Sequence, residues 1–197
     1  MSKVITALSV SVDGYITGRD PRPGHGLGDG GVLFDWYSSG DVPSRAFPGF
    51  TLTAESVGFF DEAAGRVGAS LAGRKTYTDS NDFAGGAPHP TAPLVVLSHQ
   101  ELTPASDRQH IVTTGLADAV DLARELAGDK DVALMGGVIT TEALKAGLVD
   151  ELILHQVPVL LGGGRPYFHE LPQHIGLRLI EAVVAPDVTH LRYEVQR

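Results

Sequence analysis

Apolar positions along the chain fall into short uninterrupted runs and into longer helical patterns. Short runs of Val, Ile, Leu and Ala that stop at Gly, Asp or Ser are typical of strands buried on both faces of a parallel sheet. On this basis strands are predicted over residues 4–12, 68–72, 94–97, 111–112, 132–135 and 151–161. Two further strands, over 177–185 and 188–195, are separated by the turn Pro186–Asp187. The chain is therefore predicted to end in an antiparallel hairpin.

Helical spacing of apolar residues appears between these strands. One helix is predicted over 56–67 with Thr53 as its cap, and another over 116–126. A third helix follows the Gly136–Gly137 turn and spans 140–146. Because strands that alternate with helices are typical of βαβ units, the pattern predicts an α/β fold with a mostly parallel central sheet.

Residues 18–50 contain many Gly and Pro residues and show no regular pattern. This composition predicts a long irregular loop, and loops of that length are usually functional or disordered. The spacing Gly26-x-Gly28-x-x-Gly31 matches the dinucleotide-binding fingerprint, but it follows no predicted strand and opens no predicted helix. We reject it as a cofactor site and interpret 18–50 as a flexible lid.

Composition limits the classes of function. The sequence has 197 residues, 43% hydrophobic and 20% charged, which predicts one ordinary globular domain over 1–197. A net charge of −9 argues against a nucleic-acid partner or an anionic membrane surface. Without cysteine there is no disulfide framework and no thiolate zinc site, so redox chemistry would need a bound cofactor. Finding neither a signal peptide nor a membrane-spanning stretch, we expect a cytoplasmic protein.

Candidate ligand-binding turns follow the predicted strands. In open α/β sheets a ligand binds at the carboxyl ends of the strands. These ends carry Asp13–Gly14, residues 73–76, Ser98–His99 and Gly136–Gly137, which we expect to converge. The Gly pair would let backbone N–H groups approach a phosphate at a helix N-terminus. A tight strand-to-helix turn explains the same pair equally well.

Charge and glycine content add two further candidates. Arg74 and Lys75 suit a phosphate, and Ser98 could donate to it. The alternative for the basic pair is a solvated position on the surface. The run 162–164 has the composition of a phosphate-binding loop but lacks the Lys-Ser/Thr ending, so a wide turn is the default interpretation.

Two acids and two aromatic residues lie near the expected cleft. Asp13 or Asp35 could donate a proton if burial raised its pKa, whereas a turn-forming Asp and a solvated loop acid are the alternatives. Phe34 and Trp36 could stack on a planar heterocycle, and packing of the loop on the core is the alternative. The eight histidines show no metal-ligand spacing, so no metal site is predicted.

Several of these segments resemble a known family. Ala7, residues 13–16, residues 73–77 and Leu97–Ser98 resemble the dihydrofolate reductase fold in order and spacing. A more specific resemblance, to the reductase domain of the riboflavin-pathway deaminase-reductase, is carried by Gly136–Gly137, 142–152 and 158–164. The resemblance covers most of the chain outside 18–50 and implies a three-layer fold.

The resemblance also implies that the chain binds NADPH. The residues implied to lie near the 2′-phosphate are Arg74, Lys75 and Ser98. Those implied for the pyrophosphate are Thr76, Gly136, Gly137, Val138, Ile139 and Thr140, and those for the nicotinamide are Ala7 and Ile16. Gly73 and His99 complete the predicted cofactor-binding set.

The chain departs from the family pattern at three points. It has no cysteine and therefore no zinc deaminase half. Met135 stands where the riboflavin enzymes usually carry a substrate-binding Glu, and Met accepts a hydrogen bond poorly. The Pro-Trp pair and the helical acid of dihydrofolate reductases are replaced by Asp35–Trp36 and Asp61–Glu62. These departures argue against folate as the substrate.

The sequence thus predicts an NADPH-dependent reductase that acts on a small polar heterocycle or a sugar-linked amine. Its substrate is expected between Asp13, the segment 34–36, Met135 and the nicotinamide. The terminal strands are expected to pair two subunits in a homodimer. The rival hypothesis is a non-catalytic NADPH-binding or ligand-sensing dimer, because no proton donor is secure.

Overall fold

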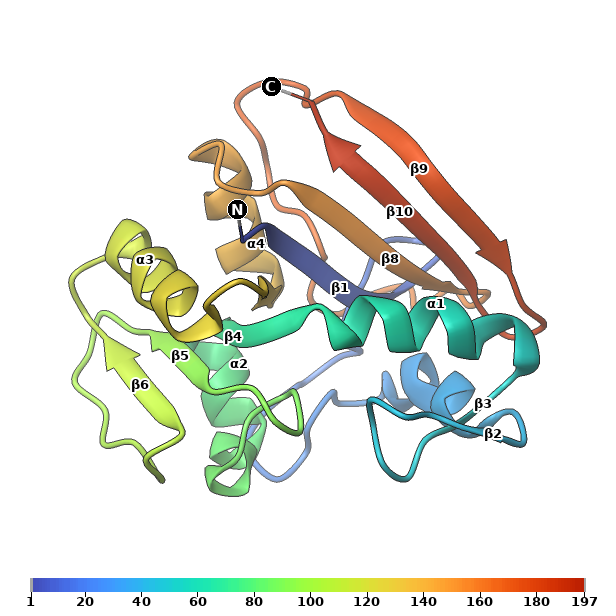
Figure 1. Ribbon diagram of the computed structural model, residues 1–197, viewed down its shortest axis with the longest axis horizontal. Helices are drawn as coiled ribbons and strands as arrows, with labels where there is room; N and C mark the ends of the chain where they lie inside the picture. The colour runs from blue at the N-terminus through green and yellow to red at the C-terminus, as the bar shows by residue number, and fades with distance from the viewer. Residues whose placement is uncertain (1, 197) are drawn as a thin grey trace.

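A single eight-stranded sheet organises the computed structural model, which describes residues 2–196 (Figure 1). The spatial order of its strands is β6-β5-β4-β7-β1-β8-β10-β9. Their bounds are β1 Val4–Ser11, β4 Val67–Gly73, β5 Leu94–Leu97, β6 Gln109–Val112, β7 Asp131–Met135, β8 Glu151–Val157, β9 Leu177–Val184 and β10 Thr189–Val195. Neighbours from β6 to β8 pair in parallel, whereas β10 is antiparallel to both β8 and β9. The predicted α/β fold with a C-terminal hairpin is confirmed.

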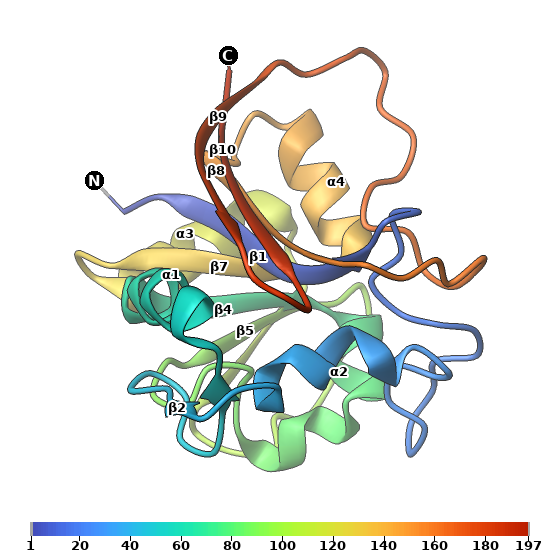
Figure 2. The ribbon, with the colours of Figure 1, turned by 90° about the vertical axis from the view of Figure 1, so that its right-hand side faces the viewer.

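Helices cover both faces of the sheet and make three layers (Figure 2). One face packs against α3 (Leu116–Ala127) and α4 (Gly137–Lys145), and their small apolar residues share a cluster with Leu71 and Leu134. The other face packs against α1 (Ala54–Gly65) through Phe59 and Ala63. Alternate side chains of each strand therefore enter two separate hydrophobic layers.

The boundaries of the elements follow from local chemistry. Thr53 caps α1 by accepting a hydrogen bond from the backbone N–H of Ser56, as predicted. The predicted strand 151–161 ends early, at Val157, because Pro158 has no backbone N–H to continue the ladder. A short helix, α2 (Arg74–Asp79), occupies the segment that was predicted only as a turn. The sequence gives little sign of it, because only Tyr77 is buried.

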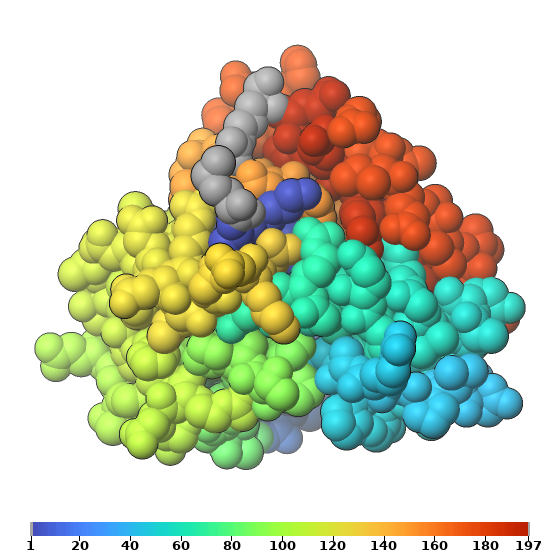
Figure 3. All heavy atoms as spheres, viewed as in Figure 1, coloured from blue at the N-terminus to red at the C-terminus, as the bar shows by residue number. Residues whose placement is uncertain are grey.

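The segment 18–50 is more ordered than predicted. It contains the 3-10 helix η1 (Gly31–Ser38) and a small antiparallel pair, β2 (Val42–Pro43) with β3 (Thr51–Leu52). Leu33, Trp36 and Leu52 pack with Phe60 of α1 in a second hydrophobic cluster. The prediction of one irregular loop over 18–50 is therefore wrong from Gly31 onward, while residues 18–30 contain no helix or strand. In Figure 3 the end of this segment protrudes beside α1, on the opposite side from α3.

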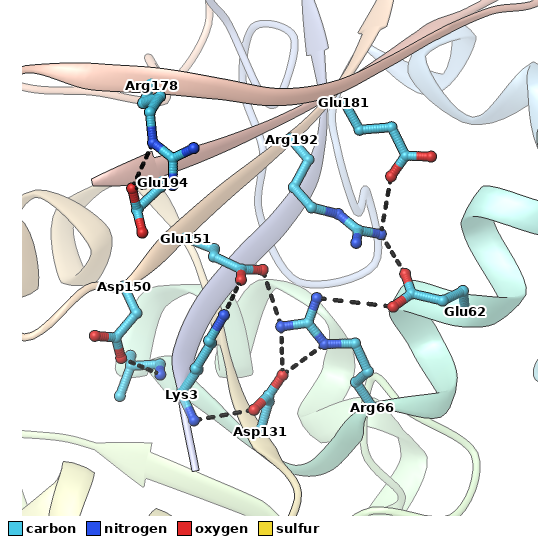
Figure 4. A network of polar contacts seen from close by, with 11 residues as sticks. Lys3, Glu62, Arg66, Asp131, Asp150, Glu151, Arg178, Glu181, Arg192 and Glu194 are labelled. Atoms are coloured by element: carbon cyan, nitrogen blue, oxygen red, sulfur yellow. Dashed lines mark hydrogen bonds and ion pairs between the residues drawn. The ribbon is translucent and has the colours of Figure 1, made fainter. Parts of the chain in front are cut away.

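Ion pairs connect the amino ends of the central strands (Figure 4). The buried Glu151 carboxylate of β8 contacts Lys3 and Arg66, and Arg66 also pairs with Asp131 of β7 at 2.7 Å. Burial alone would raise the pKa of Glu151, but hydrogen bonds from Lys3 and Arg66 outweigh it and lower the pKa below its ordinary value. The network thus ties α1 to three strands, at the end of the sheet away from the candidate turns.

No helix within residues 2–196 is long and apolar enough to cross a membrane.

Candidate functional site

Two of the four predicted turns meet at the carboxyl ends of adjacent strands. Strands β4 and β7 are neighbours, and they lead into α2 and α4 respectively. The turns are so close that a Cβ at Gly136 would lie 2.6 Å from the Thr76 Oγ1 atom. Gly136 also has a φ of +116°, which strongly favours glycine. The turns at 73–76 and 136–137 therefore lie side by side.

The amino end of α4 is built to leave its backbone N–H groups open. Gly136 precedes the helix, and no side chain caps it. Gly137 lets the backbone approach residue 166, because a Cβ there would lie 2.3 Å from the Pro166 carbonyl oxygen. Thr140 is fully buried, and its Oγ1 atom has no hydrogen-bond partner. A helix terminus with open donors and an unpaired hydroxyl suits an anionic ligand.

Arg74 and Lys75 differ from every other basic residue in the described chain. Their side chains make no hydrogen bond or ion pair within residues 2–196. All other Lys and Arg side chains there contact a carboxylate or a backbone carbonyl. In a chain of net charge −9 this leaves two cations without a partner, at the first turn of α2. Lys75 is exposed and Arg74 half-buried, so a solvated position on the surface stays open as the alternative.

Ser98 and His99 are less suited to a phosphate than predicted. Ser98 is buried, and its Oγ donates to the carbonyl of Gln100 at 2.6 Å while accepting from the Gln100 N–H at 3.0 Å. Its only hydroxyl proton is therefore used within its own turn. The predicted donation from Ser98 to a 2′-phosphate therefore requires this turn to open, and it stays a prediction. His99 is exposed beside it.

Asp13 is a structural acceptor and not an acid with a raised pKa. Its carboxylate accepts from the Ser11 hydroxyl at 2.6 Å and from the N–H groups of Leu161 and Gly162 at 3.1 and 2.7 Å. The Ser11 hydrogen bond, followed by those from the backbone, lowers the pKa of Asp13. Asp35 is exposed in η1. Neither acid meets the burial condition on which the proton-donor prediction rested.

The two predicted aromatic contacts have different surroundings. Trp36 is 1% exposed, and its Nε1 donates to the Ser9 Oγ at 3.0 Å. The rings of Phe60, His155 and His190 surround it, so the stacking prediction for Trp36 is wrong and packing is the correct interpretation. Phe34 is 42% exposed and stacks on Tyr37. It retains a ring edge on the surface.

The predicted nicotinamide neighbours lie on β1 and just beyond it. Ala7 is half-buried and packs on the same cluster as Ala133 of β7. Met135 follows the last paired residues of β1 and β7, Thr6 and Leu134, and it packs partly on the cluster around Tyr77. The carboxyl ends of these strands therefore present small or apolar side chains. Ile16 is half-buried and donates its N–H to Arg165.

Sequence reasoning missed the segment 165–167, which runs beside the Gly136–Gly137 turn and the end of α2. The Tyr167 hydroxyl is buried against the Thr6 hydroxyl, and burial raises the pKa of Tyr167 well above its ordinary value. Arg165 pairs with Asp79 at the end of α2. The preceding glycines form a turn: a Cβ at Gly164 would lie 2.0 Å from the Thr17 carbonyl oxygen. In the sequence, the only sign of this segment is the Gly run 162–164 before it, which was interpreted as a wide turn.

Comparison with known proteins agrees with this geometry. The family model described as RibD C-terminal domain matches residues 2–191. No curated protein sequence matches the chain.

Solved structures resemble the chain along its whole length. A protein provisionally assigned to riboflavin biosynthesis, from Shewanella sp. PV-4, is 25% identical with a TM-score of 0.71, and 100% of both chains is covered. A pyrimidine reductase-like protein from Corynebacterium diphtheriae is 16% identical with a TM-score of 0.63, covering 100% of this chain and 92% of that one. Dihydrofolate reductase from Enterococcus faecalis, complexed with NADP(H), is 14% identical with a TM-score of 0.61, covering 99% and 97%. The predicted dihydrofolate reductase-like fold is confirmed.

Proposed function

Since the chain belongs to the RibD C-terminal domain family, we propose that it is an NADPH-dependent reductase of the riboflavin-pathway type. Its substrate class is a small polar heterocycle or a ribosylamine. The observation that carries the choice of cofactor is the pair Arg74 and Lys75, the two basic side chains without a partner in residues 2–196. A 2′-phosphate is the group that distinguishes NADPH from NADH, and a guanidinium and an ammonium together match its charge.

The amino end of α4 supplies the place for the pyrophosphate. The N–H groups of Gly137, Val138 and Ile139 lie in the first turn of the helix, where its dipole favours an anion. Thr76 reaches the same point from α2, next to Gly136. The unpaired Oγ1 of Thr140 adds a buried hydroxyl that a ligand oxygen would satisfy. The residues present therefore fit a dinucleotide.

The nicotinamide would lie beside Ala7 and Ile16, next to Met135. When bound, NADPH supplies the hydride for the reduction. The small side chain of Ala7 leaves room for a flat ring against β1, and Met135 gives that region an apolar wall. Because Asp13 is held ionised, we propose that solvent water provides the proton that completes the reaction.

A fluorescence titration of the purified protein with NADPH and with NADH tests the cofactor. Replacing Arg74 or Lys75 by Gln should weaken NADPH binding by about 10-fold or more and leave NADH binding unchanged, because only the 2′-phosphate contact is lost. Lys145→Gln is the matched control: it removes one positive charge from an exposed pair with Glu142 at the far end of α4. Equal affinity for the two cofactors in the unmodified protein would refute the assignment.

The lowered pKa of Asp13 and the exposure of Asp35 favour a second candidate, a ligand-sensing protein that binds NADPH without turnover. A panel of pterins, aminouracil ribosylamines and quinone-like compounds separates the two. Oxidation of NADPH by any member establishes a reductase. Tight NADPH binding with no oxidation across the panel favours the sensor.

We also propose that β9 mediates a homodimer. This strand lies at the edge of the sheet, and Leu177, Leu179, Ile180 and Val184 are 42 to 73% exposed. An exposed apolar edge strand invites pairing with another strand, and a second copy of this chain offers the same edge. Light scattering after size exclusion should give twice the chain mass. Leu179→Asp should give a folded monomer. Val138→Asp, at a site that is away from β9 and even more exposed than Leu179, should not.

A further inference from the structure

Residues 17–30 form a compact loop, here called the 17–30 loop, that closes on itself. The Gly18 N–H donates to the Leu27 carbonyl, and the Arg19 N–H donates to the Asp29 carboxylate at 2.5 Å. A Cβ at Gly28 would lie 1.8 Å from the Arg19 carbonyl oxygen. Gly28 therefore allows a close approach of the backbone within the loop, whereas a Cβ at Gly26 or Gly31 would meet nothing within 4 Å.

Arg165 joins this loop to α2. Its backbone N–H donates to the Thr17 hydroxyl at 3.1 Å, and its Nη2 donates to the Pro21 carbonyl at 3.2 Å. Its Nη1 lies 2.5 Å from the Oδ2 of Asp79, the last residue of α2. The side chains of Arg165 and Asp79 are 32% and 14% exposed. The contact is an ion pair by distance only, because the buried Oδ2 of Asp79 makes no hydrogen bond and Arg165 stays partly in water.

The segment around Arg165 also contacts the Gly136–Gly137 turn at the start of α4. The Arg165 carbonyl accepts from the Ile16 N–H, and the next residue, Pro166, lies directly against Gly137 at the start of α4. Figure 2 shows the early loop running from the end of β1 down the right-hand edge, past α2. Arg165 therefore stands where the 17–30 loop, α2 and α4 meet.

We propose that Arg165 and Asp79 are positioning residues for the cofactor. Their ion pair holds the 17–30 loop against α2 and keeps the Arg74–Lys75–Thr76 turn at a fixed place relative to the start of α4. Neither residue contacts the cofactor. Loss of the pair would leave these turns to be ordered at the moment of binding, and that ordering costs affinity. The inference rests on the proposed NADPH function.

The test replaces Arg165 by Gln and Asp79 by Asn, singly and together. Either single variant should weaken NADPH binding by about five-fold to ten-fold. The double variant should bind NADPH no more weakly than the weaker-binding of the two single variants, because both substitutions remove the same contact. The ratio of NADPH affinity to NADH affinity should decrease, since the displaced turn, Arg74–Lys75–Thr76, is the one that would hold the 2′-phosphate. Arg165→Lys should recover part of the affinity.

Hydrogen–deuterium exchange without cofactor gives a second readout. Amides of residues 17–30 should exchange faster in Arg165→Gln and Asp79→Asn, and saturating NADPH should slow them again. Arg178→Gln is the matched control, because it breaks an exposed Arg–Glu pair in the hairpin and should change neither quantity. Asp79→Asn nearly preserves side-chain shape, so it tests the pair even if Arg165→Gln folds poorly.

The outcomes separate this inference from the proposed function. If the unmodified protein binds NADPH and both single variants bind it equally well with an unchanged NADPH preference, the positioning role is refuted while the cofactor assignment stands. If the variants weaken NADPH and NADH to the same extent, the pair is a general structural contact and the inference is refuted. If the unmodified protein binds no NADPH, the proposed function fails, and this inference fails with it.

Discussion

Asp13 illustrates how a carboxylate at the edge of a site acquires a structural role. The conformation of its turn places three donors around it, from Ser11, Leu161 and Gly162. Each donor stabilises the ionised form, so the group is unsuited to give up a proton at neutral pH. Its place in the sequence suggests a site residue, whereas its hydrogen bonds are those of a residue that stabilises a turn.

Asp13→Asn tests this interpretation at the residue scale. The substitution should leave NADPH affinity unchanged and should not alter the acidic limb of the pH profile for whichever panel compound is reduced, because no proton passes through this carboxyl. It should increase amide exchange at residues 161 and 162, since Asn offers one acceptor oxygen where Asp offers two. Loss of activity together with a flattened acidic limb would restore Asp13 as the proton donor.

Single residues also show what local sequence can and cannot predict. Gly136 was predicted correctly as part of a strand-to-helix turn, because its neighbours on both sides belong to that turn. Trp36 was assigned an open heterocycle contact as one possibility, yet its surroundings come from Ser9, Phe60 and His190, on three other elements. Arg165 had no local signal, since its partners lie in the 17–30 loop and α2. Residues defined by distant contacts cannot be read from neighbouring positions.

At the scale of elements, the site is the meeting of two helix starts. α4 could be predicted from the sequence, because an apolar strand run, a Gly pair and apolar residues at helical spacing follow one another. α2 was not, because it is short, contains two Thr residues with low helix propensity and buries only Tyr77. Its existence depends on packing against β4 and β5, which is a tertiary effect.

Gly136→Ala tests the junction of these two elements. At a φ of +116° the new Cβ is strained by about 1–3 kcal/mol, and it would also lie 2.6 Å from the Thr76 hydroxyl. We expect a lower thermal midpoint together with weakened NADPH binding, because Thr76 must move.

Gly147→Ala is the matched control for that experiment. Gly147 also has a positive φ, of 65°, but a Cβ there would meet nothing within 4 Å. It should lower the thermal midpoint without affecting NADPH binding. If both variants bound the cofactor normally, Gly136 would belong to the fold and not to the site.

At the scale of the whole molecule, a buried polar chain connects α1, η1 and the C-terminal hairpin. His155 of β8 and His190 of β10 are paired in register, and their Nδ1 atoms lie 2.8 Å apart. The other ring nitrogen of His190 lies 2.9 Å from the Ser56 hydroxyl of α1. Trp36 of η1 packs on both rings, 5.0 and 5.1 Å away between ring centroids. Two protonated imidazoles cannot share such a contact, so the fold requires at least one of the two rings to be neutral.

This arrangement predicts that acid weakens the fold before the carboxylates titrate. Burial lowers the pKa of His190 to about 4, from an ordinary value of 6.5, and lowers that of His155 as well. Between these values the unfolded chain binds a proton at His190 that the folded chain does not, so stability falls as the pH drops from about 6.5, and the part of the fall due to His190 levels off near 4. A shift of this size corresponds to about 3 kcal/mol for His190.

Urea unfolding followed by the fluorescence of Trp36, the only tryptophan, measures this dependence directly. His190→Gln should be less stable at pH 7 and should show a shallower loss of stability between pH 6.5 and 4, because one of the two depressed histidines is gone. His174→Gln, which removes an exposed histidine, should retain the steep dependence of the unmodified protein. An equally steep loss in His190→Gln would mean that acid acts elsewhere. The ion pairs around Glu151 would then be the next candidate, since the lowered pKa of that carboxylate also makes it lose stability on acidification, but only as the pH falls below its ordinary value.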